Sequence, residues 1–572
     1  MFRHLLAAVT VAAVAAHASD ARACGCFAMG STAQPVVQAG ERILFAHEAD
    51  QVIAYIQIKY QGAADQFGWI VPLPSVPTLE LGTDELFTML DSTTLPQYRL
   101  TRTQQFCNGG QSSSTNSDGS FGCGADFSTA AGGAYGGSDM NVAATSDLAL
   151  GGIVVESASI GPYDYAVLKA DDETAMLQWL SDNRYFVPAG TMDAVKPYIH
   201  AGAYFLALKL SGGQTAGDIA PIVLHYTSDL PMIPITLTQV GAVDNMGILV
   251  WVAGEARAIP RNYYHVVLDD LPVWFSNFTQ YNQWLINAVH EAPGKHGFIT
   301  QYAGPSALVH DKLAYPGRFG DLATLRAQTT KSSYLAYLRD HGYPFNSALL
   351  SILSRYIPEP AAVVAMGVSL SQFYQFYDSY SSYDQDSDPD GGAPAPFDPN
   401  ALTDEIDARI VTPTNDANAL LGRHRYLTRL YTALSPKDMT IDPVFSSNKE
   451  IGDVSLVHAA TLTTPCIGQP WLATDLGFEA QYVNGIPPGV GLPGALRVEL
   501  IRDAGQPELV QDNHDAIVAA LGPVDHGRAT SHDDSSGCGC TVGKRRMHTN
   551  VAMLLAVCAM ALTVRSLRRR RS

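Results

Sequence analysis

Short apolar runs separated by turn residues dominate the first half of the sequence and constrain the fold more than any other feature. The run Gln51–Tyr60 is rich in β-branched and aromatic residues and alternates in polarity, which is typical of a β-strand. Neighbouring runs at Glu41–Ala46 and Phe67–Pro74 predict two more strands, and the three together predict an antiparallel meander. Only a few helical segments interrupt the later runs, so strict strand–helix alternation is absent. The pattern predicts an α+β fold whose N-terminal domain is rich in antiparallel sheet, not a doubly wound fold.

The sequence changes character near Arg318, where helical spacing replaces strand alternation. An acidic segment rich in Pro and Gly then predicts a linker between this more helical region and a mixed C-terminal region. A last apolar run predicts one hydrophobic helix at the C-terminus. We expect this division: signal peptide 1–23, α+β domain 24–315 with a Gly/Ser-rich insert at 107–135, helical region 318–382, acidic linker 383–400, mixed region 401–523, polar tether 524–540, and hydrophobic helix with an Arg-rich tail 541–572.

The start Cys24-Gly-Cys26-Phe, the first two predicted strands and the segment Phe67-Gly-Trp-Ile-Val-Pro-Leu-Pro74 together resemble the bacterial DUF2330 family. The resemblance covers residues 24–315, and a later block, 426–445, is similar to the C-terminal part of longer members. It supports the predicted compartment and architecture. It implies no activity, cofactor or site residue for this chain.

The first residues have the features of a secretory signal peptide. A basic start precedes an apolar stretch, and Ala21-Arg22-Ala23 offers a small-residue cleavage site before Cys24. A lipoprotein signal is the alternative, because Cys24 would become the first mature residue. Ala21 and Arg22 fit that alternative less well, since a leucine and small residues usually stand there. We expect the secretion machinery to export the chain to the cell envelope.

The tail combines Cys538 and Cys540 in a Gly-Cys-Gly-Cys motif, the apolar run Val551–Val564 and a terminal cluster of arginines. A helix over this run would span about 21 Å, short of a hydrocarbon core of about 30 Å, so it predicts a marginal transmembrane helix. The three parts in this order resemble the myxobacterial C-terminal sorting signal (MYXO-CTERM). That resemblance implies recognition by a membrane-embedded sorting protease, removal of the helix, and surface delivery with modification at a cysteine. An ordinary membrane anchor is the alternative.

The body between the two terminal signals is strongly acidic. The chain carries a formal net charge of −19, although the segment after Cys540 holds eight basic residues and no acidic one. An acidic surface repels nucleic acids and anionic lipids and favours association with cations. We therefore expect no nucleic-acid partner, and membrane contact only through the C-terminal helix or a lipid.

Five cysteines lie in this body, and an oxidising compartment favours disulfides between them. Cys107 and Cys123 flank a loop rich in Gly, Ser and Asn, and a disulfide closing it would stabilise the fold by about 3 kcal/mol. A metal site is the alternative, but the neighbouring sequence offers no further soft ligands. Cys466 is then expected to pair with Cys24 or Cys26, a choice that the sequence leaves open.

Asp386, Asp388 and Asp390 alternate with other residues ahead of a glycine, as in the first half of an EF-hand calcium loop. The bidentate glutamate of such a loop is missing, because Phe397 stands at its twelfth position. Two interpretations stay open: a calcium-stapled linker, and a solvated acidic linker without metal, which we favour. No other cofactor is expected.

Sequence motifs for catalysis are missing. The chain has no nucleophile elbow, Walker loop or dinucleotide-binding glycine motif, and the spacing of His290 and His296 does not fit a zinc protease. We therefore assign no catalytic residue and expect a non-enzymatic envelope protein, a binding or structural module that is membrane-anchored or sorted to the surface. An envelope hydrolase with a site assembled from dispersed residues is one alternative. A calcium-stabilised adhesion or assembly module is the other.

Mass spectrometry of the intact protein from its native cells, with peptide mapping of both ends, tests the two terminal signals. We expect a mature chain that begins at Cys24 and ends at or near Cys538 or Cys540 with added mass, because sorting removes the apolar run. A mature chain that still contains Arg571 would contradict sorting and indicate a simple anchor.

Overall fold

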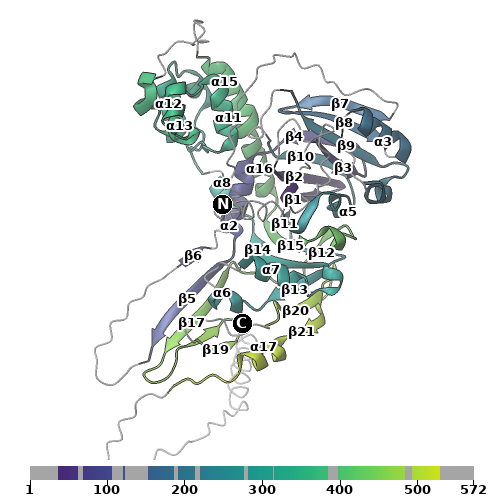
Figure 1. Ribbon diagram of the computed structural model, residues 1–572, viewed down its shortest axis with the longest axis vertical. Helices are drawn as coiled ribbons and strands as arrows, with labels where there is room; N and C mark the ends of the chain where they lie inside the picture. The colour runs from purple at the N-terminus through teal and green to yellow at the C-terminus, as the bar shows by residue number, and fades with distance from the viewer. Residues whose placement is uncertain are drawn as a thin grey trace, which may run out of the picture.

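The computed structural model describes residues 37–61, 68–105, 120–122, 153–169, 171–183, 185, 191–212, 219–275, 281–313, 315–383, 397–482 and 492–527. Within these residues the strands form sheets of ten, five, four and two strands. Helices cover the sheets and also gather in a separate group near the top of the view in Figure 1. The predicted α+β class, with a sheet-rich N-terminal part and more helices later, is confirmed.

The ten-stranded sheet forms the centre of the molecule. Neighbouring strands run antiparallel except for two parallel pairs, β1 with β11 and β13 with β14. Across the sheet the order is β21 (Glu508–Asp512), β20 (Ala495–Leu500), β13 (Tyr264–Leu268), β14 (Gly297–Pro305), β15 (Tyr426–Leu434), β11 (Ala242–Gly254), β1 (Val37–Glu48), β2 (Gln51–Gln61), β10 (Ile222–Thr227) and β4 (Thr78–Leu81).

The predicted meander is wrong in its third strand. β1 and β2 do form the expected hairpin, but β3 (Gly68–Leu73) leaves it and pairs with β9 (Tyr204–Leu210) in the four-stranded sheet. Every residue of β3 is buried, so this strand needs cover on both faces. The position beside β2 goes instead to β10.

The four-stranded sheet has the order β3-β9-β8-β7, with β8 at Tyr163–Lys169 and β7 at Val154–Ile160. One face packs on β1, β2 and β10 through a shared apolar core that includes Phe45, Trp69 and Leu224. The other face is covered by α3 (Glu173–Asp182) and α4 (Thr191–Val195), with Trp179 and Leu180 in that second core. The two sheets therefore form a sandwich at this end of the molecule.

Strands from the C-terminal region complete sheets that begin in the N-terminal region. β15 lies between β14 and β11, and β20 pairs with β13. β17 (Val457–Thr464) runs parallel to β5 (Gln97–Gln104) in the five-stranded sheet β19-β18-β17-β5-β6, whose other members are β18 (Trp471–Thr474), β19 (Glu479–Gln481) and β6 (Ser120–Gly122). β12 (Arg257–Pro260) and β16 (Phe445–Asn448) form the two-stranded sheet. The mixed region 401–523 thus shares its sheets with the preceding domain.

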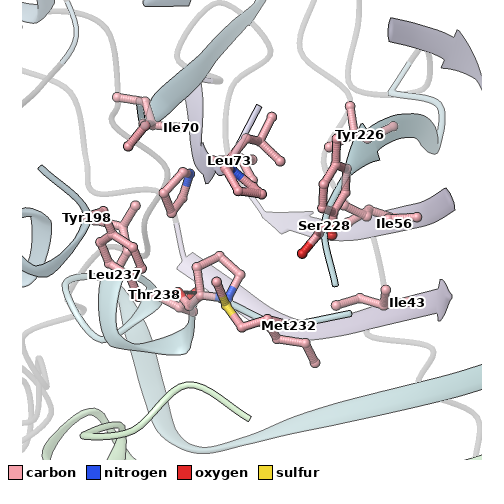
Figure 2. Close-up of a pocket in the computed structure, with 18 of the residues that line it drawn as sticks. Ile43, Ile56, Ile70, Leu73, Tyr198, Tyr226, Ser228, Met232, Leu237 and Thr238 are labelled. Atoms are coloured by element: carbon pink, nitrogen blue, oxygen red, sulfur yellow. Dashed lines mark hydrogen bonds between the residues drawn. The ribbon is translucent and has the colours of Figure 1, made fainter. Parts of the chain in front are cut away.

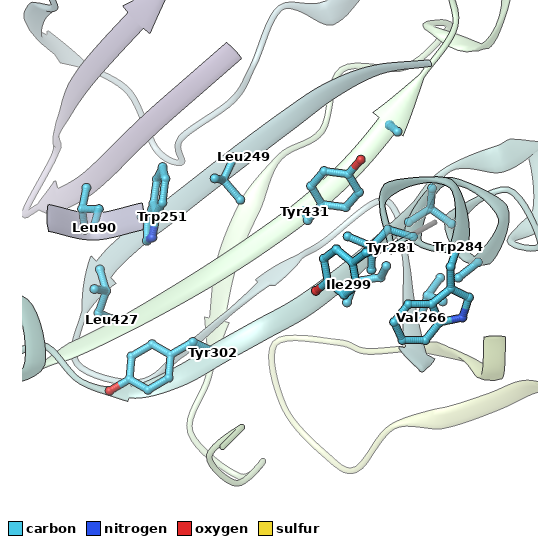
Figure 3. Packing of buried hydrophobic residues seen from close by; sticks show 14 of the residues in the cluster. Leu90, Leu249, Trp251, Val266, Tyr281, Trp284, Ile299, Tyr302, Leu427 and Tyr431 are labelled. Atoms are coloured by element: carbon cyan, nitrogen blue, oxygen red, sulfur yellow. The ribbon is translucent and has the colours of Figure 1, made fainter. Parts of the chain in front are cut away.

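The largest apolar core lies on the opposite face of the ten-stranded sheet. Trp251, Leu249 and Tyr431 of the sheet lie in this core together with helical residues such as Leu90, Tyr281 and Trp284 (Figure 3). The helices that contribute to this core are α2 (Asp84–Thr94), α6 (Leu271–Phe275), α7 (Tyr281–Val289), α8 (Ala307–Leu313), α16 (Thr412–Arg423) and α17 (His514–Leu521). These helices cover the face of the ten-stranded sheet that is opposite the sandwich.

The predicted helical region has its own core, formed by residues such as Tyr334, Leu353 and Phe373. The helices around it are α9 (Leu322–Arg326), α10 (Lys331–Asp340), α11 (Ser347–Tyr356), α12 (Ala361–Ala365), α13 (Leu370–Gln375), α14 (Tyr377–Tyr380) and α15 (Pro399–Ile406), followed by a π-helical turn at Asp407–Val411. In the part of the chain that is described, no helix has the length and apolar character needed to cross a membrane.

Candidate functional site

An apolar pocket lies at one end of the sandwich, between the ten-stranded sheet and β3. Its volume is about 180 Å³. One wall comes from β1, β2 and β10, the facing wall from β3, and a third side from the segment 230–238, which contains α5 (Ile235–Thr238). Figure 2 shows Ile43, Ile56, Leu73, Tyr226 and Leu237 around the common space.

The strand pattern explains why the walls are apolar. Ile43 and Phe45 are two apart on β1, and Ala54 and Ile56 are two apart on β2, so each pair faces the same side of the sheet. Ala54 has a small side chain, which leaves room between the layers. Pro74 and His200 are exposed, while Met232 is half-buried, and these residues stand at the edge of the pocket.

Glu41 is the one acidic residue in the lining, and it lies on the same face of β1 as Ile43 and Phe45. The residue is 7% exposed, and its buried Oε2 accepts no hydrogen bond within the described part of the protein. Burial raises the pKa of Glu41 to about 7, because removal from water disfavours the charged form. The pocket therefore holds one carboxyl group that gains or loses its proton near neutral pH.

Three of the four hydroxyl groups in the lining, those of Ser228, Thr238 and Tyr198, are already hydrogen-bonded. Ser228 Oγ donates to the Leu230 carbonyl at 3.0 Å, and Thr238 Oγ1 donates to the Pro234 carbonyl at 3.3 Å. The Tyr198 hydroxyl donates to the Asp442 carboxylate at 2.6 Å. None of these contacts joins a hydroxyl to a histidine, so they do not form an activated nucleophile of the serine–histidine type.

The arrangement is suited to binding rather than to acyl transfer. An apolar cavity of about 150 Å³ in another protein binds benzene, so a pocket of this size accepts a small ring or a short alkyl group. Ligand pockets commonly combine apolar walls with a few polar groups that fix orientation. Here Glu41 provides that polar group.

Most residues singled out from the sequence lie outside the described residues: Ala23, Cys24, Cys26, Cys107, Cys123, Asp386, Asp388, Asp390, Cys538, Cys540, Val551 and Val564. Their predicted roles in processing, disulfides, calcium binding and membrane insertion stay predictions. Cys466 is described and lies two residues beyond β17, half-buried, with its Sγ 3.5 Å from the Gln105 carbonyl oxygen. Among described residues, no group of three or more His, Cys, Asp or Glu side chains is placed to hold a metal ion.

The sequence reasoning missed Glu41. The sequence did indicate its place, because Glu41, Ile43 and Phe45 alternate along a predicted strand. This spacing puts the carboxyl group on the apolar face of that strand. The pocket itself could not be predicted in the same way, because its facing wall comes from β3. The sequence pattern predicts this strand in a meander with β1 and β2, whereas it pairs with β9.

Comparison with known proteins gives one match. The family model described as "Uncharacterized protein conserved in bacteria (DUF2330)" matches residues 19–310. No curated protein and no solved structure matches the chain.

Replacing Glu41 with glutamine tests the burial of this carboxyl. The native state holds the proton of Glu41 up to about pH 7, whereas the unfolded chain releases it near pH 4.5, so the native state binds more protons between these values. Wild-type stability should therefore fall across this window relative to Glu41→Gln. Between pH 4.5 and pH 7 the stability difference between the two proteins should change by roughly 3 kcal/mol in favour of the variant, measured by urea unfolding.

Asp244→Asn, which removes an exposed acid on β11, is the control and should leave the pH profile unchanged. Asp269 is also buried, with a pKa raised by burial to about 8, but it is present in all three proteins and cancels in their comparison. Parallel pH profiles for wild type and Glu41→Gln would contradict the assignment.

Proposed function

The chain belongs to the DUF2330 family of bacterial proteins, and we propose that it is an exported envelope protein that binds a small apolar ligand beside Glu41. The observation that carries the proposal is a buried carboxyl group without a hydrogen-bond donor at Oε2, set in an otherwise apolar pocket.

A core that served packing alone would not favour this carboxyl. Burying a polar group without a hydrogen bond costs roughly 1–3 kcal/mol by mutational data. An apolar side chain at position 41 would avoid that cost. A ligand with a donor group at the right place supplies the missing partner. The pocket then selects ligands that carry a donor, because a ligand without one leaves Glu41 without a hydrogen bond.

The chemistry of the pocket describes the ligand class. The walls favour a ring or short alkyl body, and Glu41 favours one amine or hydroxyl group attached to it. Since the pKa of Glu41 lies near 7, the group accepts a hydrogen bond from a hydroxyl in either protonation state, and it pairs with an amine when ionised.

Sequence features near the two ends of the chain support the proposed location. The signal-peptide features before Cys24 support export by the secretion machinery, and the tail from Cys538 onward supports a membrane anchor or cleavage by a sorting protease. An acidic body, for which we expect no nucleic-acid partner, is consistent with that location. The pocket would then bind molecules that are present outside the cytoplasm.

The hydrolase alternative is less favoured at this pocket. Ser228 and Thr238 donate to backbone carbonyls, and the ring Nδ1 of His200 lies against the Ala201 carbonyl at 3.2 Å. A hydrolytic site needs a nucleophile held by a base, and these side chains are held by the backbone instead.

Titration with benzyl alcohol and with toluene tests the ligand class. Thermal unfolding should show saturable stabilisation by both, with benzyl alcohol at least tenfold tighter, because only the alcohol satisfies Glu41. Met232→Trp should weaken both at least tenfold, since the larger ring covers the pocket edge. Val364→Trp, at an exposed site in the helical region, is the matched control and should bind as wild type does.

Two results would contradict the proposal. One is an absence of saturable binding by wild type, and the other is equal binding by the Met232→Trp and Val364→Trp variants.

A further inference from the structure

A second, polar cleft lies at the other end of the ten-stranded sheet and shares no lining residue with the apolar pocket. Its volume is about 380 Å³. The walls come from β13, β14 and β20, from β12, and from β17 of the five-stranded sheet. Six acidic, basic or histidine side chains line it: Arg257, His265, Asp270, His458, Arg497 and Glu499.

Each carboxylate of the cleft has a close partner. Glu499 is paired with Arg497 at 3.0 Å, and its other oxygen lies 3.4 Å from His265 Nδ1. Asp270 is paired with His458 Nδ1 at 2.6 Å. Both carboxylates therefore have a direct partner other than Arg257.

Arg257 is the exception. Its guanidinium donates to the Gly452 carbonyl at 3.2 Å and to Thr300 Oγ1 at 3.3 Å, and it contacts His265 Nε2 at 3.1 Å. All three partners are uncharged when His265 is neutral, the form favoured because burial lowers the pKa of His265. Within the described residues Arg257 makes no ion pair, and its buried Nε has no acceptor. Glu499 and Asp453 attract this guanidinium, but neither forms an ion pair with it. Buried charges are normally paired directly, so Arg257 lacks a counter-ion in direct contact.

His458 offers a second cationic contact on the wall formed by β17. Asp270 holds Nδ1, and Nε2 makes no hydrogen bond in the described part of the chain. The Tyr98 ring stacks on the imidazole with ring centroids 4.9 Å apart, which fixes its plane. Burial opposes the charged imidazole, but the hydrogen bond and charge of Asp270 outweigh it and hold the pKa of His458 above its usual value.

We infer that this cleft binds the anionic group of a ligand, a carboxylate or a phosphate, with Arg257 as its counter-ion and His458 Nε2 as a second donor. A planar guanidinium and an imidazole on different strands suit an oxyanion, which accepts hydrogen bonds from both. The inference does not depend on the apolar pocket, since the two sites are lined by different residues.

Calorimetric titration of the full-length protein with inorganic phosphate and with acetate tests this site, at constant ionic strength and pH 6.5. Wild type should show saturable binding of at least one anion. Arg257→Met should weaken it at least tenfold, and His458→Asn, which can still donate an amide hydrogen bond to Asp270, at least threefold. Arg425→Met, at a side chain 85% exposed, is the control and should bind within twofold of wild type.

The two anions distinguish the source of the charge. Tighter phosphate binding would indicate a phosphorylated ligand, and tighter acetate binding a carboxylic acid. Equal affinity in wild type and Arg257→Met, or no saturable binding by wild type, would overturn the inference. If Arg257→Met does not fold, His458→Asn decides, and an unchanged affinity in that variant would overturn it as well.

Discussion

An ion pair between the buried Arg429 of β15 and the half-buried Asp91 of α2 holds together two parts of the chain that are far apart in sequence. Their side-chain atoms approach to 2.8 Å, and Arg429 also donates to Gln301 and lies over the Trp251 ring. Arg42 of β1 reaches the other oxygen of Asp91 at 2.8 Å. Because β15 separates β14 from β11, this pair fixes the strand through which both halves of the large sheet are joined. Loss of one partner of such a pair typically costs 3–5 kcal/mol.

The same constraint positions the apolar pocket. Successive residues of a strand point to opposite faces, so Arg42 turns toward Asp91 while Glu41 and Ile43 turn toward the sandwich. The register of β1 therefore sets both the ion pair on one face and the carboxyl on the other. A shift by one residue would exchange the two faces, placing Glu41 in the helical layer and Arg42 in the pocket.

Local patterns could be predicted from the sequence, whereas long-range pairings could not. The β1–β2 hairpin follows from two alternating runs joined by a short turn, and the helical region follows from its spacing. The place of β3 does not, because a fully buried strand has no polar face to show which sheet it joins. The pairing of β15 with β11 joins residues about 180 positions apart, so no local signal specifies it. The position of Glu41 on the apolar face of β1 could be predicted from local alternation. Its pocket could not, because it depends on the long-range placement of β3.

The most direct test of the binding function compares native and denatured masses of the protein purified from its own cells. We expect a native mass excess that disappears on denaturation and belongs to a small apolar molecule with one amine or hydroxyl group. The Met232→Trp protein from the same cells should lack that excess. Identical native and denatured masses for the wild-type protein would contradict the proposed binding of a small ligand beside Glu41.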